Sequence, residues 1–495
     1  MQLNLAHINY RYPAAAEPAL QGVSTTFPQG WTGLVGDNGS GKTTLALIAC
    51  GLLQPSSGTV APTLLARYCA QDATEEPENL ADFALAYDNV AVNIRTDLDI
   101  ADDWHERYST LSCGQQKRLQ VACTLWAAPD VLAMDEPTNH LDASTKRTIS
   151  TALSRFGGIG LLVSHDRELL DTLCTQCLFF AHGTAIMRPG GYTQAASQAD
   201  LERASAIHTR ETARKEKTRI EREAQRRREE ASRAAGRRSL KGVDKHDSDA
   251  RFRKNIYVVS GQDGKVGKLS ARMTGRLENL EAQLATTRVE KRYDADVWFD
   301  AEPSRRKVLL RMEPDILSLG EAELHVPALF IGNTDHIGLI GDNGSGKSTL
   351  VRSIVEQLPE TVRCLYIPQE ANQAQGQATI RELNNLPSDK RGRVLSIVAQ
   401  LNSDPDRILE GDAISPGEMR KLMLALGILE SPELIIMDEP SNHLDLGSTE
   451  ALERMLAAYP GALLLVSHDA ALVQAATSIS WEIEHAPNGF TLTLH

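Results

Sequence analysis

The sequence predicts an α/β protein in which a long helical segment joins two similar domains. The two halves of the 495-residue chain carry the same motifs in the same order, which is an internal repeat. Within each half, short apolar runs alternate with helical patterns, as in a doubly wound sheet. Between the halves, residues 195–235 contain no Pro or Gly and are dominated by Ala, Arg and Glu, so they favour a long helix.

The repeat sets the domain boundaries. Lys42 corresponds to Lys347, an offset of 305 residues, and Glu136 corresponds to Glu439, an offset of 303. Each copy therefore spans roughly 190 residues, the size of an ordinary α/β domain. The predicted parts are a first domain at 1–194, a linker at 195–300 and a second domain at 301–495.

Apolar runs mark the centre of each predicted sheet. Residues 131–134 and 434–437 are apolar throughout, as are residues 160–163 and 463–466. A strand that is apolar on both faces is typical of a parallel sheet covered by helices on both sides. We therefore predict a buried parallel sheet in each half.

The composition also indicates the compartment. No run of about 18 apolar residues is present, so we expect no membrane-spanning helix. The first residues lack the basic and apolar segments of a signal peptide. The seven cysteines are an odd number and mostly scattered, which fits reduced thiols. Together these features predict a cytoplasmic protein.

The linker carries a charge opposite to that of the domains. Residues 201–292 hold 25 Lys and Arg against 14 Asp and Glu, a local charge of +11. The whole chain has a net charge of −13, so the remainder carries −24. A basic insert between two acidic bodies indicates an anionic target that is met mainly through the insert.

We predict that the linker is a helical hairpin. A second helix is expected from about 268 to 292, because apolar residues recur along one of its faces. Residues 251–257, Arg-Phe-Arg-Lys-Asn-Ile-Tyr, would then form a basic tip with aromatic side chains. A solvated charged spacer without a target is the alternative interpretation. The apolar residues are Leu269, Met273, Leu277, Leu280 and Leu284.

Each half contains a glycine-rich phosphate loop of the pattern Gly-x4-Gly-Lys-Ser/Thr. The backbone N–H groups of such a loop surround phosphate oxygens, and the following helix adds its positive N-terminal end. Lys42 and Lys347 would reach the β and γ phosphates of ATP. The loop residues predicted to bind the nucleotide are Gly36, Asn38, Gly39, Gly41, Lys42, Thr43 and Thr44, and in the second copy Gly341, Asn343, Gly344, Gly346, Lys347, Ser348 and Thr349.

Polar residues at strand ends predict the chemistry. Asp135 and Asp438 each end an apolar strand, where a carboxylate can hold Mg²⁺ with the hydroxyl that follows the loop lysine. The next residues, Glu136 and Glu439, are placed to polarise an attacking water. An Asp-Glu pair at a strand end is more often a solvated loop, but the matched spacing in both copies argues against that role.

Two further residue pairs complete the predicted sites. His165 and His468 each lie 29 residues beyond their glutamate, and this matched spacing favours a contact with the γ-phosphate over a structural role. Gln71 and Gln369 are weaker candidates for sensing Mg²⁺ and the attacking water. The predicted catalytic residues are Glu136, Glu439, His165 and His468. The predicted metal-site residues are Thr43, Gln71, Asp135, Ser348, Gln369 and Asp438.

These motifs together resemble the ATP-binding cassette superfamily. The diagnostic element is Leu-Ser-Cys-Gly-Gln-Gln at residues 111–116, which has a counterpart at residues 414–419. In that superfamily two cassettes face each other head to tail and share each ATP. The resemblance implies one ATP between Lys42 and the pair Ser415 and Gly417, and another between Lys347 and the pair Ser112 and Gly114.

The sequence departs from the family pattern in its second copy. Pro416 replaces a glycine and removes an N–H, while Glu418 brings a carboxylate close to an anionic ligand. We therefore expect the two ATP sites to differ. Tyr12, which precedes Lys42 by 30 residues, is placed to stack on adenine, whereas Leu317 holds the matching position in the second copy.

The Asn-His-Leu-Asp segments, the tandem cassettes and the charged linker resemble the ABC-F family over the whole chain. Members of that family are not transporters. Those that are understood act on ribosomes, and some rescue stalled ribosomes or protect against antibiotics. Some members also insert an arm into the first cassette, but only 41 residues separate Gln71 from Ser112, so we expect no large arm here.

This resemblance implies a specific architecture and activity. The fold would be α/β, with two P-loop ATP-binding cassette domains joined by a long α-helical hairpin linker. The activity would be ATP hydrolysis with ATP and Mg²⁺ as cofactors, in a translation factor whose basic linker contacts ribosomal RNA and tRNA. The chain would be a monomer in which its own two cassettes pair.

Two other functions remain open from the residues alone. One is the ATPase subunit of a membrane transporter, which would need a permease-docking surface between Gln71 and Ser112. The other is a cytosolic ATPase that remodels a different nucleic-acid complex.

Overall fold

The computed structural model describes residues 1–13, 15, 17–139, 141–181, 183–238, 273, 275–282, 284, 302–320, 322–369, 373–410, 414–487 and 489–495. The chain forms two compact units, of which one is Ala196–Lys291 and the other combines Met1–Ala195 with Arg292–His495. The larger unit contains both halves of the repeat. Within the described ranges, no helix is both long and apolar enough to cross a membrane.

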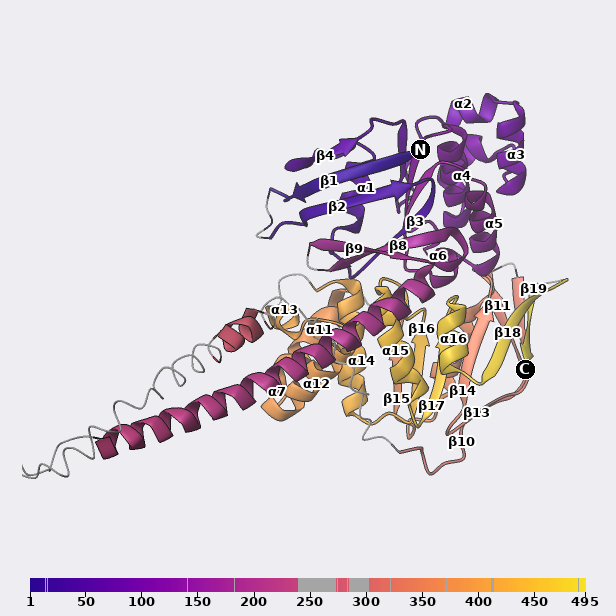
Figure 1. Cartoon of the computed structure of the whole chain (residues 1–495). Helices are drawn as coiled ribbons and strands as arrows, with labels where there is room; N and C mark the ends of the chain where they lie inside the picture. Colours follow the sequence, from indigo (N-terminus) through magenta and orange to yellow (C-terminus); the bar gives the residue numbers. More distant parts are fainter. Residues whose placement is uncertain are drawn as a thin grey trace, which may run out of the picture. The chain divides into compact units, whose positions relative to one another are not determined.

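The first half contains two sheets (Figure 1). One is antiparallel, in the order β2-β1-β4, and the other has six strands in the order β5-β6-β7-β3-β8-β9. Pairing in the second sheet is parallel from β5 to β8, and only β8–β9 is antiparallel. The strands are β1 (Gln2–Tyr10), β2 (Leu20–Pro28), β3 (Gly30–Val35), β4 (Ser57–Ala61), β5 (Ala66–Cys69), β6 (Val131–Asp135), β7 (Ile159–Val163), β8 (Cys174–Ala181) and β9 (Thr184–Pro189).

The helices of the first half connect and cover these strands. In Figure 1 the antiparallel strands lie on one side of this half, and α2 and α3 lie on the opposite side. The helices are α1 (Lys42–Ala49), α2 (Leu80–Leu85), α3 (Asn89–Asp97), the 3-10 helix η1 (Trp104–Thr110), α4 (Cys113–Trp126), α5 (Ala143–Ser154) and α6 (Arg167–Leu173).

The second half repeats this plan with a larger sheet, in the order β11-β12-β19-β18-β14-β17-β16-β15, and a separate β10–β13 pair. The strands are β10 (Val308–Met312), β11 (Asp315–Leu319), β12 (Ala322–Val326), β13 (Leu329–Gly332), β14 (His336–Gly341), β15 (Cys364–Ile367), β16 (Leu434–Asp438), β17 (Ala462–Val466), β18 (Ile479–Ala486) and β19 (Gly489–Leu494). The helices are α10 (Lys347–Gln357), α11 (Gln373–Asn385), α12 (Ser388–Gln400), α13 (Pro405–Glu410), α14 (Pro416–Leu429), α15 (Leu446–Ala457) and α16 (Ala470–Ala476).

The core explains why the central strands are apolar throughout. Along β16, Leu434 and Ile436 pack into one hydrophobic cluster, while Ile435 and Met437 pack into another. Successive side chains of a strand point to opposite faces, so both faces of this sheet are buried. The predicted parallel sheets are therefore confirmed, and they carry antiparallel strands at one end. The α/β fold with two similar domains is confirmed as well.

The linker begins with one long helix, α7 (Tyr192–Arg238), close to the predicted span. Residues 275–282 are also helical. Ion pairs join the two stretches, from Lys217 Nζ to Glu281 Oε1 at 2.8 Å and from an Arg276 guanidinium nitrogen to Glu216 Oε1 at 2.9 Å. The predicted basic tip at 251–257 lies outside the described residues, and so does Leu269. The boundaries at 194 and 300 remain our prediction.

Candidate active sites

Each phosphate loop runs from the end of a central strand into a helix. Gly41, at the start of α1, has φ 102°, and a Cβ there would lie 2.7 Å from the Ala19 carbonyl oxygen, so only glycine fits. Lys42 Nζ donates to the carbonyl oxygens of Gly36 at 2.8 Å and Asp37 at 2.9 Å. This places the ammonium inside the loop, where phosphates are expected.

The second loop repeats this geometry. Lys347 Nζ donates to the Gly341 carbonyl at 2.7 Å and the Asp342 carbonyl at 2.9 Å. Burial lowers the pKa of Lys42 and of Lys347, while nearby carboxylates, led by Glu136 and Glu439, oppose that shift. A bound anionic ligand would offset the free-energy cost of burying both ammonium groups.

The strand-end aspartates meet the hydroxyls that the sequence predicted. Thr43 Oγ1 donates to Asp135 Oδ2 at 2.8 Å, and Ser348 Oγ donates to Asp438 Oδ2 at 2.9 Å. A carboxylate beside a hydroxyl supplies the hard oxygen ligands that Mg²⁺ takes when phosphates complete its shell. The residues present therefore fit the metal.

One member of this site was missed from the sequence. Tyr68 donates its hydroxyl proton to Asp135 Oδ2 at 2.8 Å. Tyr366 matches it in the second copy, where burial raises its pKa and the charge of Asp438 adds to the effect. The available signal was a tyrosine three residues before each predicted glutamine, Gln71 and Gln369.

The two glutamates occupy an unusual backbone conformation. Glu136 has φ 44° and Glu439 has φ 47°, values that a residue with a side chain rarely adopts. Burial raises the pKa of Glu136 to about 8 and that of Glu439 to about 7. In the described part of the chain, the buried Oε1 of each has no hydrogen-bond partner. An unsatisfied buried acceptor at this point suits a bound water.

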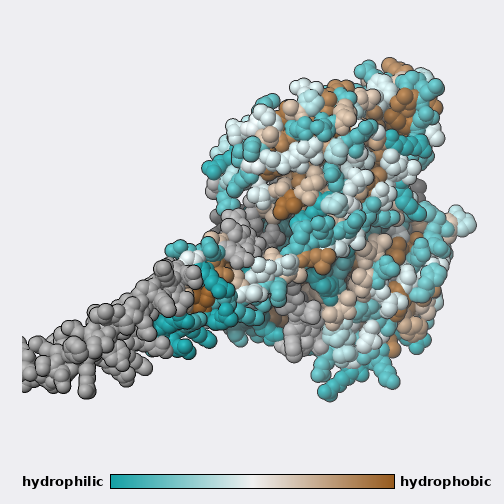
Figure 2. Space-filling view, in the orientation of Figure 1, coloured by the Kyte–Doolittle hydropathy of each residue, from teal (hydrophilic) through white to brown (hydrophobic). Residues whose placement is uncertain are grey.

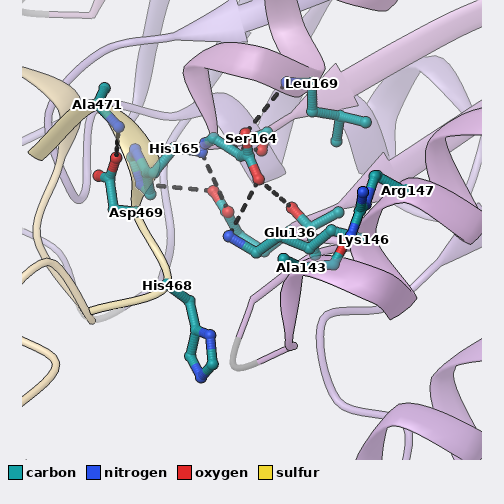
Figure 3. A network of polar contacts seen from close by, with 12 residues as sticks. Glu136, Ala143, Lys146, Arg147, Ser164, His165, Leu169, His468, Asp469 and Ala471 are labelled. Atoms are coloured by element: carbon teal, nitrogen blue, oxygen red, sulfur yellow. Dashed lines mark hydrogen bonds and ion pairs between the residues drawn. The ribbon is translucent and has the colours of Figure 1, made fainter. Parts of the chain in front are cut away.

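Each histidine contacts the glutamate of its own half. The His165 backbone N–H donates to Glu136 Oε2 at 3.2 Å, and His165 Nε2 lies 3.4 Å from Glu136 Oε1 (Figure 3). His468 and Glu439 repeat both contacts, at 3.3 and 3.4 Å. Burial and the loop lysines lower the pKa of both imidazoles to about 4, so they are neutral at physiological pH.

The second histidine also reaches its phosphate loop. His468 Nε2 lies 3.2 Å from Lys347 Nζ and 3.0 Å from Asn343 Oδ1. The structure thus brings loop, strand end and histidine together, as the matched spacing predicted. The catalytic roles of these residues remain predictions.

The serine–glycine elements begin helices α4 and α14. Ser112 caps α4, with its Oγ accepting from the Gln115 N–H, while Gln115 Oε1 accepts from the Ser112 N–H at 3.0 Å. Ser415 caps α14 in the same way, with Glu418 in place of glutamine. This is a capping box in both copies. Gly114 and Gly417 lie in the first turns of these helices.

The second capping box holds its serine more tightly. Ser415 Oγ donates to Glu418 Oε2 at 2.8 Å, in addition to the reciprocal backbone bonds. Pro416 is the first residue of α14, where the missing N–H costs the helix nothing. Glu418 therefore has a structural role that the sequence analysis did not assign, although the Ser-x-x-Glu pattern at 415–418 carries its signal.

Within the larger unit, the phosphate loop of the first half meets the Asn-His-Leu-Asp segment of the second. Asn38 Nδ2 donates to the His443 carbonyl at 3.1 Å. Asn402 Nδ2 donates to Asp37 Oδ1 at 3.2 Å and lies 3.4 Å from Asp445 Oδ1. These contacts agree with a head-to-tail pairing. Asp142 and Asp445, which the sequence analysis did not single out as site residues, face the opposite lysines, Lys347 and Lys42.

The remaining predicted residues lie around these centres. The Tyr12 hydroxyl is 3.1 Å from Thr44 Oγ1, at the start of α1. Leu317, its counterpart, is partly buried against the core. Gln71 and Gln369 are held through their carbonyls by the buried side chains Lys117 and Arg420. Gly39, Gly344 and Thr349 lie in the loops and in the first turn of α10.

Comparisons with known proteins agree with this architecture. The family model described as "ABC transporter" matches residues 20–139 and 324–442, once in each half. The ribosome protection protein VmlR of Bacillus subtilis is 28% identical over 95% of this chain and 85% of its own length. The energy-dependent translational throttle protein EttA of Escherichia coli is 27% identical over 90% of this chain and 85% of its own length.

A solved structure supports the fold as well. The RNase-L inhibitor superposes with a TM-score of 0.64 over 98% of this chain and 90% of its own, at 17% identity. Two matched cassettes and relatives that span nearly the whole chain identify an ATP-binding, ATP-hydrolysing enzyme. The chain belongs to the ATP-binding cassette superfamily and, within it, to the ABC-F family.

Proposed function

We propose that this protein is an ATPase that binds the ribosome and acts as a translation factor. The observation that carries the proposal is the combination of two hydrolysis sites with a linker of local charge +11. Phosphate neutralisation dominates binding to RNA, so a basic segment suits ribosomal RNA or tRNA. The names of the relatives VmlR and EttA, which concern ribosome protection and translation, point to the same target.

In the proposed cycle, ATP joins the two cassettes and hydrolysis releases them. Lys42 and Lys347 hold phosphates, and Mg²⁺ binds at Asp135 with Thr43 and at Asp438 with Ser348. Glu136 and Glu439 orient the water, while the neutral histidines contact the γ-phosphate. Closure then places the linker against RNA, in a monomeric, cytoplasmic protein.

Sedimentation with ribosomes tests this proposal. The variant with Glu136→Gln and Glu439→Gln should bind ATP, fail to hydrolyse it and pellet with ribosomes through a sucrose cushion. The same variant without nucleotide is the control and should remain in the supernatant. Pelleting with membranes only, or an absence of RNA binding, would contradict the proposed function.

A further inference from the structure

The first cassette exposes a cluster of apolar side chains at α2 and α3. Leu85 is 77% exposed and Tyr87 is 80% exposed, and Val90 and Val92 lie exposed nearby. We call these four residues the α2–α3 surface. Figure 2 shows hydrophobic side chains in this region next to hydrophilic ones. Single exposed apolar residues are ordinary, but four within eight positions indicate a contact surface.

This surface is held in place by its neighbours. The Arg95 guanidinium lies 5.4 Å from the centre of the Tyr87 ring and donates to the Ala86 carbonyl at 2.7 Å. Asp88 caps α3, accepting from the Val90 N–H at 2.9 Å. Binding would therefore cost little ordering of the backbone or of the Tyr87 ring.

A pocket of about 330 Å³ opens beside Tyr87. Its wall combines the Phe83 and Tyr87 rings with the acidic residues Asp102, Asp103 and Glu106. Aromatic rings, with the Arg95 guanidinium over them and three carboxylates beside them, fit a side chain that has an apolar stem and sits in a basic segment.

The charge of this region distinguishes it from its counterpart. Residues 72–107 hold 11 Asp and Glu against 2 Arg, a net charge of −9. The equivalent stretch of the second cassette, residues 370–414, holds 7 against 5, a net charge of −2. All but one of the 11 carboxylates are exposed. Such a field repels RNA phosphates and attracts a cationic protein.

We propose that the α2–α3 surface docks a Lys- and Arg-rich segment of a ribosomal protein, one of whose apolar side chains enters the pocket beside Tyr87. This inference rests on the proposed function. The two oppositely charged regions then have separate roles, since the basic linker binds RNA and the acidic α2–α3 surface binds protein.

Site-specific cross-linking tests the proposal. Tyr87 is replaced by the photo-reactive amino acid benzoylphenylalanine in the variant that carries Glu136→Gln and Glu439→Gln. This protein is loaded with ATP, bound to purified bacterial ribosomes, irradiated and analysed by mass spectrometry. We expect a cross-link to a basic ribosomal protein. Leu85→Lys should lower its yield about tenfold, whereas the matched exposed residue Leu52, changed to Lys, should leave it unchanged.

The outcomes separate the two proposals. A cross-link to ribosomal RNA, or no cross-link while the protein still pellets with ribosomes, would overturn the docking proposal and leave the proposed function standing. Equal yields in Leu85→Lys and Leu52→Lys would also overturn it. A protein that does not pellet with ribosomes at all would overturn both.

Discussion

Some residues in this protein adopt energetically unfavourable states that are typical of functional sites. Glu136 and Glu439 share a left-handed backbone, deep burial and a raised pKa, at matched positions in two halves. Strain of this kind persists only where the surrounding structure imposes it. Both glutamates were predicted from their spacing, but their strain and their shifted ionisation depend on packing that the motif does not state.

Replacing the two buried glutamates by glutamine should stabilise the protein, and the gain in stability should be larger at high pH. The pKa values of Glu136 and Glu439 in the folded chain, about 8 and about 7, exceed the value in the unfolded chain. The protonated carboxyl groups therefore contribute fully to the free energy of unfolding below the unfolded pKa, and this contribution is lost as pH rises through the folded pKa values. Glutamine remains neutral throughout. Without nucleotide, we expect Glu136→Gln with Glu439→Gln to raise Tm over wild type by roughly 2–4 °C at about pH 9 and by less at about pH 6.

Scanning calorimetry across this range provides the measurement. Replacing the exposed carboxylates Glu17 and Glu313 by Gln is the matched control and should leave Tm close to that of wild type at every pH. A difference between the active-site variant and wild type that stays constant with pH would show that burial does not control these carboxyl groups.

The Glu418 carboxylate predicts unequal ATP sites. It accepts the hydroxyl proton of Ser415, whereas the side chain of the matching residue Gln115 bonds the backbone N–H of Ser112. The carboxylate therefore competes with an ATP phosphate for the Ser415 hydroxyl, and its negative charge also repels that phosphate. Glu418→Gln should lower the dissociation constant for ATP at the site built with Lys42 about fivefold, which is roughly 1 kcal/mol of binding free energy. Gln115→Glu should weaken the other site by a similar factor.

Binding of a fluorescent ATP analogue, in the background that carries Glu136→Gln and Glu439→Gln, would resolve the two sites. Each exchange retains a residue that can complete the capping box, so helices α4 and α14 should keep their stability. Unchanged affinities in both exchanges would mean that this residue does not face the nucleotide.

At the scale of elements, helix starts and strand ends position the chemistry. Asp142 and Asp445 cap α5 and α15, each accepting a backbone N–H at 2.8 Å, from Thr145 and Ser448. The same caps end the two Asn-His-Leu-Asp segments. A single side chain thus begins a helix and places a carboxylate opposite the lysine of the other cassette, which is a tertiary relation that the local motif does not reveal.

Substitutions in the linker should weaken ribosome binding without changing the basal rate of ATP hydrolysis. Changing Arg251, Arg253 and Lys254 to Ala should weaken ribosome association and reduce its salt dependence, by up to about three units of slope in log–log form. Basal ATP hydrolysis should stay close to wild type, because these residues lie outside both phosphate loops. Co-sedimentation at several salt concentrations and a phosphate-release assay provide the two readouts.

A matched set of changes separates the linker from basic charge in general. Lys390, Arg391 and Arg393, on α12 of the second cassette, are changed to Ala as the control. We expect a smaller loss of ribosome association in this control. An equal loss of ATPase and of ribosome binding in the linker variant would instead make the linker part of the catalytic fold.

For the whole molecule, the paired sites predict that nucleotide controls closure. The contacts from Asn38 to His443 and from Asn402 to Asp37 join phosphate loop to opposite cassette within the larger unit. ATP with Mg²⁺ should reduce the radius of gyration of the variant with Glu136→Gln and Glu439→Gln, as measured by small-angle X-ray scattering. Adding Lys42→Ala and Lys347→Ala should abolish the change. A radius that ATP leaves unaltered would exclude closure as the working step.

The sequence by itself determined the α/β class, the repeat, the apolar central strands and which residues meet at each candidate site. These features depend on local patterns, such as loop glycines, strand-end carboxylates and matched spacing, which are readable because they recur. Tertiary structure alone decided that Tyr68 bonds Asp135, that Asn38 bonds the His443 carbonyl, and that Leu85 and Tyr87 remain exposed. Such facts depend on which distant elements pack together, and burial, strain and ionisation follow from that packing.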